Sequence, residues 1–222
     1  MSELLRCIEI EPATEATASV IWLHGLGASG HDFEPIVPEL QLPADLAVRF
    51  VFPHAPQIPV TVNGGMVMPA WYDILAMDID RTVDEAGVLA SAGAVEALIE
   101  REISRGISSK RIIIAGFSQG GAVAYQAALR YPKPLAGLLT LSTYMAMPVI
   151  PSDTNATLPV MICHGRMDPV VPEQLGQRAA TILTEMGYSP QYKSYPMEHM
   201  VCLEQIRDIG QWLNERLMPP NE

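Results

Sequence analysis

Cysteine is scarce in this chain, and its placement excludes two kinds of site. Three cysteines occur in 222 residues, at Cys7, Cys163 and Cys202. An odd number at wide spacing does not make a disulfide framework, and it lacks the paired spacing of zinc ligands. Cys163 lies in an apolar run and is expected to pack as a small buried hydrophobe. The sequence therefore predicts no disulfide scaffold and no metal site.

Basic residues are also few. Lys and Arg total 14 against 25 Asp and Glu, which gives a formal net charge of −11 and a pI near 4.8. Nucleic-acid binding relies on clustered cations that release counterions from phosphates. The sequence has no such basic stripe, so nucleic acid is not an expected partner.

Long apolar runs are absent from the N-terminal segment. It reads M-S-E-L-L-R-C-I-E-I, with acidic residues and no apolar core of the length that a signal peptide or membrane span needs. We therefore expect no stable membrane insertion and a cytoplasmic location.

Glycine and small residues, in contrast, surround one serine. Residues 116–120 read G-F-S-Q-G, after the apolar run Ile112–Ala115 and before a run of small residues. The first run predicts a buried strand, and the second predicts a helix packed closely on a sheet. This is the pattern of a nucleophile elbow, whose glycines remove β-carbons that would collide. Ser118 is therefore predicted to lie in a strained turn, where N–H groups of the helix N-terminus stabilise developing negative charge.

A serine hydroxyl needs a base to accept its proton and a carboxylate to orient that base. On this kind of sheet the chain order is serine, acid, histidine, and the groups follow the carboxyl ends of strands. Of five histidines, His199 alone follows the last predicted strand, and Asp168 directly follows the strand P-V-M-I-C-H and its glycine turn. We predict Ser118 as nucleophile, His199 as base and Asp168 as orienting acid. The alternative interpretations are a solvated loop histidine and a turn-forming aspartate before proline.

Predicted strands and helices alternate along the chain. Strands are expected at 6–10, 19–24, 48–52, 60–62, 66–68, 112–115, 137–142, 159–164 and 191–195, and helices at 32–40, 82–105, 120–131, 173–186 and 202–217. This order predicts one α/β domain over residues 1–222, with a mostly parallel central sheet covered by helices on both faces. The loop at 143–158 is too short for a large cap domain, so an open site is expected.

Six segments give the chain a resemblance to a known family. They are H-G-L-G-A-S-G-H-D-F at 24–33, N-G-G-M-V-M-P-A-W-Y-D-I at 63–74, G-F-S-Q-G-G at 116–121, L-S-T-Y at 141–144, H-G-R-M-D-P-V-V-P at 164–172 and Y-P-M-E-H at 195–199. With them the chain resembles a bacterial carboxylesterase of the carboxylesterase / acyl-protein thioesterase family, which has the α/β-hydrolase fold. The resemblance covers nearly the whole chain and implies the same three catalytic residues.

The resemblance also implies an oxyanion hole made by the backbone N–H groups of Leu26 and Gln119, and a reaction without metal or cofactor. It is compatible with a homodimer. Glu198 departs from the family pattern, because many relatives carry glycine before the histidine. A bulkier anionic residue is expected to alter the packing of this loop and to raise the basicity of His199.

Apolar residues near the predicted site are candidates for an acyl groove, because methionine and aromatic side chains adapt to varied ligands. They are Met66, Val67, Met68, Trp71, Ile74, Tyr144 and Met145. Packing in the core explains each of them equally well.

The main hypothesis is a serine carboxylesterase that hydrolyses short- to medium-chain carboxylic esters, with a small-molecule ester as its partner, through an acyl-enzyme on Ser118. A first alternative, an acyl-protein thioesterase or lysophospholipase acting on long acyl chains, shares this mechanism. A second alternative is a non-catalytic binding protein on the same fold, because a fold does not fix a function.

Overall fold

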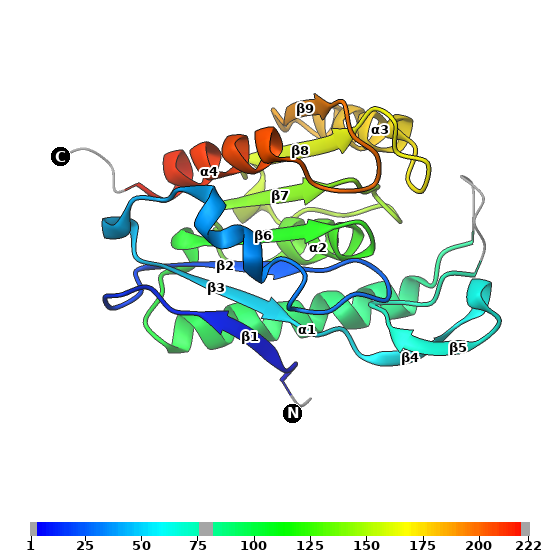
Figure 1. Ribbon diagram of the computed structural model, residues 1–222, viewed down its shortest axis with the longest axis horizontal. Helices are drawn as coiled ribbons and strands as arrows, with labels where there is room; N and C mark the ends of the chain where they lie inside the picture. Colours follow the sequence, from blue (N-terminus) through cyan, green and yellow to red (C-terminus); the bar gives the residue numbers. More distant parts are fainter. Residues whose placement is uncertain (1–3, 76–81, 219–222) are drawn as a thin grey trace.

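A seven-stranded sheet forms the centre of the computed structural model, which describes residues 4–75 and 82–218 (Figure 1). Its strands are β1 (Cys7–Ile10), β2 (Ala18–Leu23), β3 (Val48–Pro53), β6 (Ile112–Phe117), β7 (Gly137–Leu141), β8 (Val160–Gly165) and β9 (Gln191–Tyr195). Their order across the sheet is β1-β3-β2-β6-β7-β8-β9. The edge strand β1 runs antiparallel to β3, and the other neighbours pair in parallel. The predicted α/β-hydrolase architecture is confirmed.

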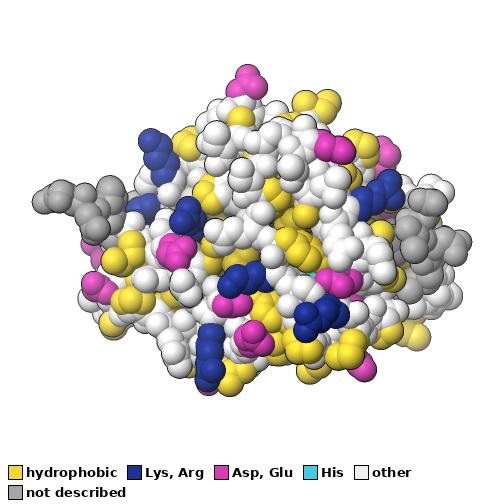
Figure 2. Space-filling view, turned by 90° about the horizontal axis from the view of Figure 1, so that it is seen from above, with side chains coloured by type: hydrophobic (Ala, Val, Ile, Leu, Met, Phe, Trp, Pro, Cys, Tyr) yellow, Lys and Arg dark blue, Asp and Glu magenta, His cyan; other side chains and the backbone are white. Residues whose placement is uncertain are grey.

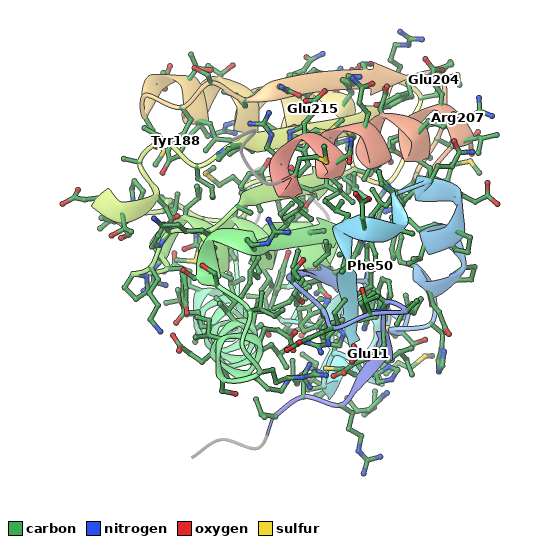
Figure 3. All side chains as sticks on the ribbon, turned by 90° about the vertical axis from the view of Figure 1, so that its left-hand side faces the viewer. Glu11, Phe50, Tyr188, Glu204, Arg207 and Glu215 are labelled. Carbon is green, nitrogen blue, oxygen red and sulfur yellow. The ribbon has the colours of Figure 1, made fainter. Side chains whose placement is uncertain are left out.

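Helices cover both faces of the sheet, as Figure 3 shows in a view along the strands. One face carries α1 (Glu85–Ser104), α2 (Gln119–Arg130) and α3 (Glu173–Glu185), and the other carries α4 (Leu203–Leu217) and the 3₁₀ helix η1 (Glu34–Leu40). Alternate strand residues serve the two cores: Ile112 and Ile114 pack with α1 and α2, while Ile113 packs with α4. Phe50, labelled in Figure 3, belongs to the α4 side. Strands buried on both faces explain why they read as continuous apolar runs.

The loops that follow the parallel strands lie together at the carboxyl end of the sheet, on the right of Figure 1. They include the glycine-rich segment after β2, the turn between β6 and α2, and the segments after β8 and β9. A two-stranded hairpin, β4 (Gln57–Val60) and β5 (Met66–Pro69), lies at the same end. Residues far apart in the sequence are thereby brought to one edge.

No large cap covers this edge in the described part of the chain, as predicted. The segment between β7 and β8 holds a single 3₁₀ turn, η5 (Asp153–Asn155), which is too small to form one. Another 3₁₀ turn, η2 (Ala44–Leu46), precedes β3, and η4 (Ser109–Arg111) precedes β6.

Three local predictions need correction. The helix expected from residue 32 is the 3₁₀ helix η1, because Pro35 and Pro38 lack the N–H donors of a regular α-helix. Helix α1 is capped by Asp84, whose side chain accepts from the Gly87 N–H, and not by Thr82. The first hairpin strand ends at Val60, and the turn η3 (Thr61–Asn63) precedes two glycines with positive φ, so the connection is longer than the expected Asn-Gly turn.

Three features of the described residues bear on possible partners: surface charge, helix length and metal-ligating side chains. On the face shown in Figure 2, the Lys and Arg side chains are scattered among Asp and Glu. Among residues 4–75 and 82–218, no helix is both long and apolar enough to cross a membrane. The same residues contain no cluster of three His, Cys, Asp or Glu placed to hold a metal ion. All three cysteines are free thiols.

Candidate active site

Ser118 occupies a sharp turn between β6 and α2. Its backbone has φ 53° and ψ −121°, a conformation that costs a non-glycine residue on the order of 1–3 kcal/mol. The two flanking glycines permit this turn. A β-carbon on Gly116 would lie 2.5 Å from the Gly120 carbonyl oxygen, and one on Gly120 would lie 2.5 Å from the His24 carbonyl oxygen. The strained elbow predicted from the motif is therefore present.

The three predicted polar groups meet at this turn. The Ser118 hydroxyl donates to His199 Nε2 at 3.0 Å, and His199 Nδ1 donates to Asp168 Oδ2 at 2.6 Å. The ring of His199 rests on Phe117, with 4.8 Å between ring centroids. Serine, histidine and aspartate thus form one hydrogen-bonded chain, contributed by the ends of β6, β8 and β9.

Asp168 is held from its other oxygen as well. Asp168 Oδ1 accepts from the backbone N–H groups of Val170 and Val171, at 2.9 and 2.8 Å. Burial alone raises the pKa of this carboxyl, but the hydrogen bonds from His199 and from the two N–H groups outweigh it, so the pKa lies below its ordinary value of 3.8. Asp168 is therefore an anion at neutral pH with its position fixed.

A second histidine supports this loop. His164 is fully buried, and its Nε2 donates to the Val171 carbonyl oxygen at 2.8 Å. The pKa of His164 is lowered, mainly because burial disfavours the cationic form of its ring. His164 Nε2 lies 3.8 Å from Asp168 Oδ2, beyond hydrogen-bond distance, and the ring is neutral. Asp168 Oδ2 therefore pairs with His199.

The predicted oxyanion donors reach the same cavity as Ser118. Leu26 lies in the loop after β2, and a β-carbon built on the preceding Gly25 would lie 3.5 Å from the Ser118 β-carbon. Gln119 is the first residue of α2, where backbone N–H groups lack helical partners. Within the described residues, neither the Leu26 nor the Gln119 N–H donates a hydrogen bond. Both donors are free to receive a substrate oxygen.

The Gln119 side chain braces the segment that follows the hairpin. Its Oε1 accepts from the Trp71 N–H at 2.9 Å, and its Nε2 donates to the Tyr72 carbonyl oxygen at 2.7 Å. Trp71, predicted to bind substrate, is instead buried, with 2% of its surface exposed, and its indole N–H donates to the His24 carbonyl oxygen. Trp71 joins the loops around the site and does not line the cavity at Ser118.

An apolar cavity of about 500 Å³ opens at Ser118. Its lining includes Leu26, Phe33, Ile74, Phe117, Tyr144, Val170, Val171, Met200 and Val201. Two predicted groove residues, Ile74 and Tyr144, are among them. Four of the others, Val170, Val171, Met200 and Val201, follow Asp168 and His199 in their loops and were not predicted as groove residues. Apolar residues close after a predicted site residue were a usable signal.

The remaining predicted groove residues lie elsewhere. Met66 and Val67 are more than 60% exposed on β5 of the hairpin, and Met68 contacts Asn63 through its sulfur. These three do not line the cavity at Ser118. Met145 lines a second apolar cavity, of about 440 Å³, between the segment after β7 and α3. Tyr144 lines both cavities.

Glu198, the departure from the family pattern, has an exposed side chain. Its backbone carbonyl accepts from the Met200 N–H, which tightens the turn that carries His199. A β-carbon on Gly165 would lie 2.5 Å from the Glu198 carbonyl oxygen, so β8 and this loop approach each other closely.

Residues 6–217 match the model of the phospholipase/carboxylesterase family. An acyl-protein thioesterase 1 from Neurospora crassa is 42% identical over 90% of this chain and 87% of its own length. An acyl-protein thioesterase 1 from Gibberella zeae is 39% identical over 94% of both chains. Both relatives are fungal, and they lend no support to the bacterial origin suggested by the resemblance.

Solved structures show the same architecture. SOBER1 from Arabidopsis thaliana superposes with a TM-score of 0.86 at 32% identity, over 90% of this chain and 99% of that one. Acyl-protein thioesterase 2 from Zea mays superposes with a TM-score of 0.83 at 29% identity, over 96% and 99% of the two chains.

Proposed function

Because the chain belongs to the phospholipase/carboxylesterase family and is a serine hydrolase of that family, we propose that it is an acyl thioesterase that removes long acyl chains from cysteine thiols. The observation that carries the proposal is the chain of hydrogen bonds from Ser118 through His199 to Asp168, which opens on an apolar cavity. The names of the fungal relatives favour thioesters over the short-chain esters of the main sequence hypothesis.

Acylation begins at the Ser118 hydroxyl. His199 Nε2 accepts its proton as the oxygen attacks the acyl carbonyl carbon, and Asp168 stabilises the resulting imidazolium. The carbonyl oxygen gains negative charge in this step. The N–H groups of Leu26 and Gln119 are the donors that receive it.

Breakdown of the tetrahedral intermediate releases the thiol and leaves an ester on Ser118. His199 returns its proton to the leaving sulfur and later activates a water that hydrolyses the ester. A cysteine thiol has a pKa of about 8.5, so a thiolate leaves more readily than an alkoxide. Thioester and ester cleavage therefore need the same residues, with less acid assistance for the thioester.

A comparison of kcat/KM for matched thioester and ester peptides tests the proposal. The purified chain should hydrolyse an S-palmitoylated peptide with a higher kcat/KM than the matched O-octanoyl or O-butanoyl serine peptide. Ser118→Ala, assayed in parallel, should hydrolyse none of them. A higher kcat/KM for the butanoyl ester than for the palmitoyl thioester would favour the short-chain carboxylesterase hypothesis instead.

Tyr144 is expected to separate the two apolar cavities and so to limit acyl length, because it lines both of them. Tyr144→Ala should join them and raise kcat/KM for palmitoyl relative to octanoyl substrates, by about fourfold for each methylene newly buried, at about 0.8 kcal/mol each. Acyl p-nitrophenyl esters of increasing length measure this shift.

Tyr144→Phe is the matched control. It keeps the ring that separates the cavities and removes the hydroxyl, which pairs with the Tyr72 hydroxyl at 2.7 Å. Tyr144→Phe should leave the length profile unchanged. The same profile in Tyr144→Ala as in the wild type would exclude the second cavity as an acyl site.

The non-catalytic alternative is not retained. A binding protein has no need for a strained serine, a hydrogen-bonded histidine and an ionised aspartate in one line. The cost of the Ser118 backbone is understandable where the hydroxyl must be presented to a substrate.

A further inference from the structure

His24 lies next to the proposed oxyanion loop, yet the reaction described above does not use it. It follows β2 directly, and only 1% of its surface is exposed. Its Nδ1 lies 2.7 Å from the Gly25 carbonyl oxygen, and its Nε2 lies 3.0 Å from the backbone nitrogen of Ala55. The ring thus joins the loop after β2 to the segment after β3.

These two contacts determine the tautomer of His24. The Ala55 N–H is a donor, so Nε2 must be the acceptor. The proton of the neutral ring then lies on Nδ1, which donates to the Gly25 carbonyl oxygen. Burial lowers the pKa of His24, which favours this neutral form.

The Gly25 carbonyl belongs to the same peptide unit as the Leu26 N–H. In a trans peptide these two groups lie in one plane and point in opposite directions. A hydrogen bond that fixes the carbonyl therefore fixes the direction of the N–H. It also polarises the amide, because linked hydrogen bonds strengthen one another.

We propose that His24 is a positioning residue that directs the Leu26 N–H at the substrate oxygen by holding the Gly25–Leu26 peptide. The proposal rests on the hydrolase function proposed above, and it assigns to a buried histidine a role in stabilising the transition state. The peptide lies beside the predicted nucleophile, since a β-carbon built on Gly25 would lie 3.5 Å from the Ser118 β-carbon. The rest of the loop is held separately, since the Gly27 N–H donates to the Pro69 carbonyl oxygen.

Two variants separate positioning from loop packing. Asparagine has its amide where Nδ1 lies, so His24→Asn keeps a donor for Gly25 and loses the acceptor for Ala55. Glutamine reaches the position of Nε2, so His24→Gln keeps the acceptor for Ala55 and loses the donor for Gly25. Each variant loses one buried hydrogen bond, and the two are therefore matched for stability.

We expect kcat of His24→Gln on p-nitrophenyl octanoate to fall by about 10–10²-fold. This loss is smaller than the loss in kcat of about 10²–10³-fold that follows complete removal of an oxyanion donor. KM should stay within about threefold, because a misdirected N–H weakens the transition state more than the ground state. Inhibition by a trifluoromethyl ketone should weaken by the same factor as kcat/KM. His24→Asn should retain kcat within about threefold of the wild type.

Wild-type kcat in His24→Gln, or equal losses in both variants at a temperature where both are folded, would overturn the proposal. If the wild type hydrolyses the ester and Ser118→Ala does not, the proposed function holds. Either of the two results above would then overturn only the role of His24. A wild type without esterase or thioesterase activity would overturn the proposed function together with it.

Discussion

Replacing Ser118 with alanine should lower kcat for ester and thioester hydrolysis by about 10⁶-fold, the largest effect expected from any single substitution. In the proposed mechanism this hydroxyl attacks the acyl carbonyl carbon, and in the structure it donates to His199 at 3.0 Å. Without it no acyl-enzyme forms, and only binding and the oxyanion donors remain. Steady-state kinetics on p-nitrophenyl octanoate measure the loss.

The protein should fold normally without this hydroxyl. Alanine keeps the β-carbon and meets the same backbone strain, so the melting temperature of Ser118→Ala should match that of the wild type. Ser104→Ala is a suitable control, because Ser104 is exposed at the C-terminal end of α1, where its hydroxyl donates to the Arg101 carbonyl oxygen. Activity within tenfold of the wild type in Ser118→Ala would exclude it as the nucleophile.

Replacing Asp168 with asparagine should lower kcat by about 10⁴-fold. The Oδ1 atom can still accept from Val170 and Val171, but an amide facing His199 Nδ1 donates where the carboxylate accepted. His199 then places its proton on Nε2 and cannot act as a base. Comparison of kcat with the wild type, at equal folded fraction, measures this loss.

Asp168→Asn also has an expected effect on stability. The pKa of Asp168 is lowered in the folded protein, so its ionised form contributes stability above the ordinary value of 3.8, and that contribution is lost as pH falls through the lowered pKa. The variant lacks this titration, and its free energy of unfolding should fall less steeply with acidification below about pH 4. Identical pH dependence in denaturant titrations of both proteins would contradict the assigned shift.

The meeting of Ser118, His199 and Asp168 was predictable from the sequence, because a local motif marks the serine and chain order marks the other two residues. The glycines around Ser118 report a backbone conformation that the structure shows directly, at φ 53°. His199 and Asp168 follow from chain order and from strand ends, which a parallel sheet converts into proximity. Once the fold is known, the proximity of these residues follows from their positions at the strand ends.

The acyl groove was harder to predict, because an apolar residue near a site looks the same whether it lines a cavity or packs in the core. Trp71 is buried, and its indole N–H donates to the His24 carbonyl oxygen. This contact joins segments 47 residues apart, which the sequence pattern does not reveal. Met66 and Val67 lie on a two-stranded hairpin outside the main sheet, where a run of apolar residues does not indicate which side faces the protein. Such orientations depend on tertiary contacts.

The cap of α1 shows the same limit at smaller scale. Thr82 and Asp84 are both good N-cap residues, and the sequence offers no reason to prefer the second. Asp84 takes the role because its carboxylate accepts from the Asp73 N–H as well as from the Gly87 N–H. A contact with Asp73, which lies outside the helix, therefore decides between two residues of similar intrinsic preference.

The central claim is that Ser118 carries the acyl group during turnover, and mass spectrometry of a trapped intermediate tests it most directly. The chain would be mixed with p-nitrophenyl palmitate, quenched in acid within milliseconds and digested. The account predicts a palmitoyl mass increase on the peptide that contains Ser118, and none on the corresponding peptide of Ser118→Ala. Acylation of another residue, or turnover without any acylated peptide in the wild type, would contradict it.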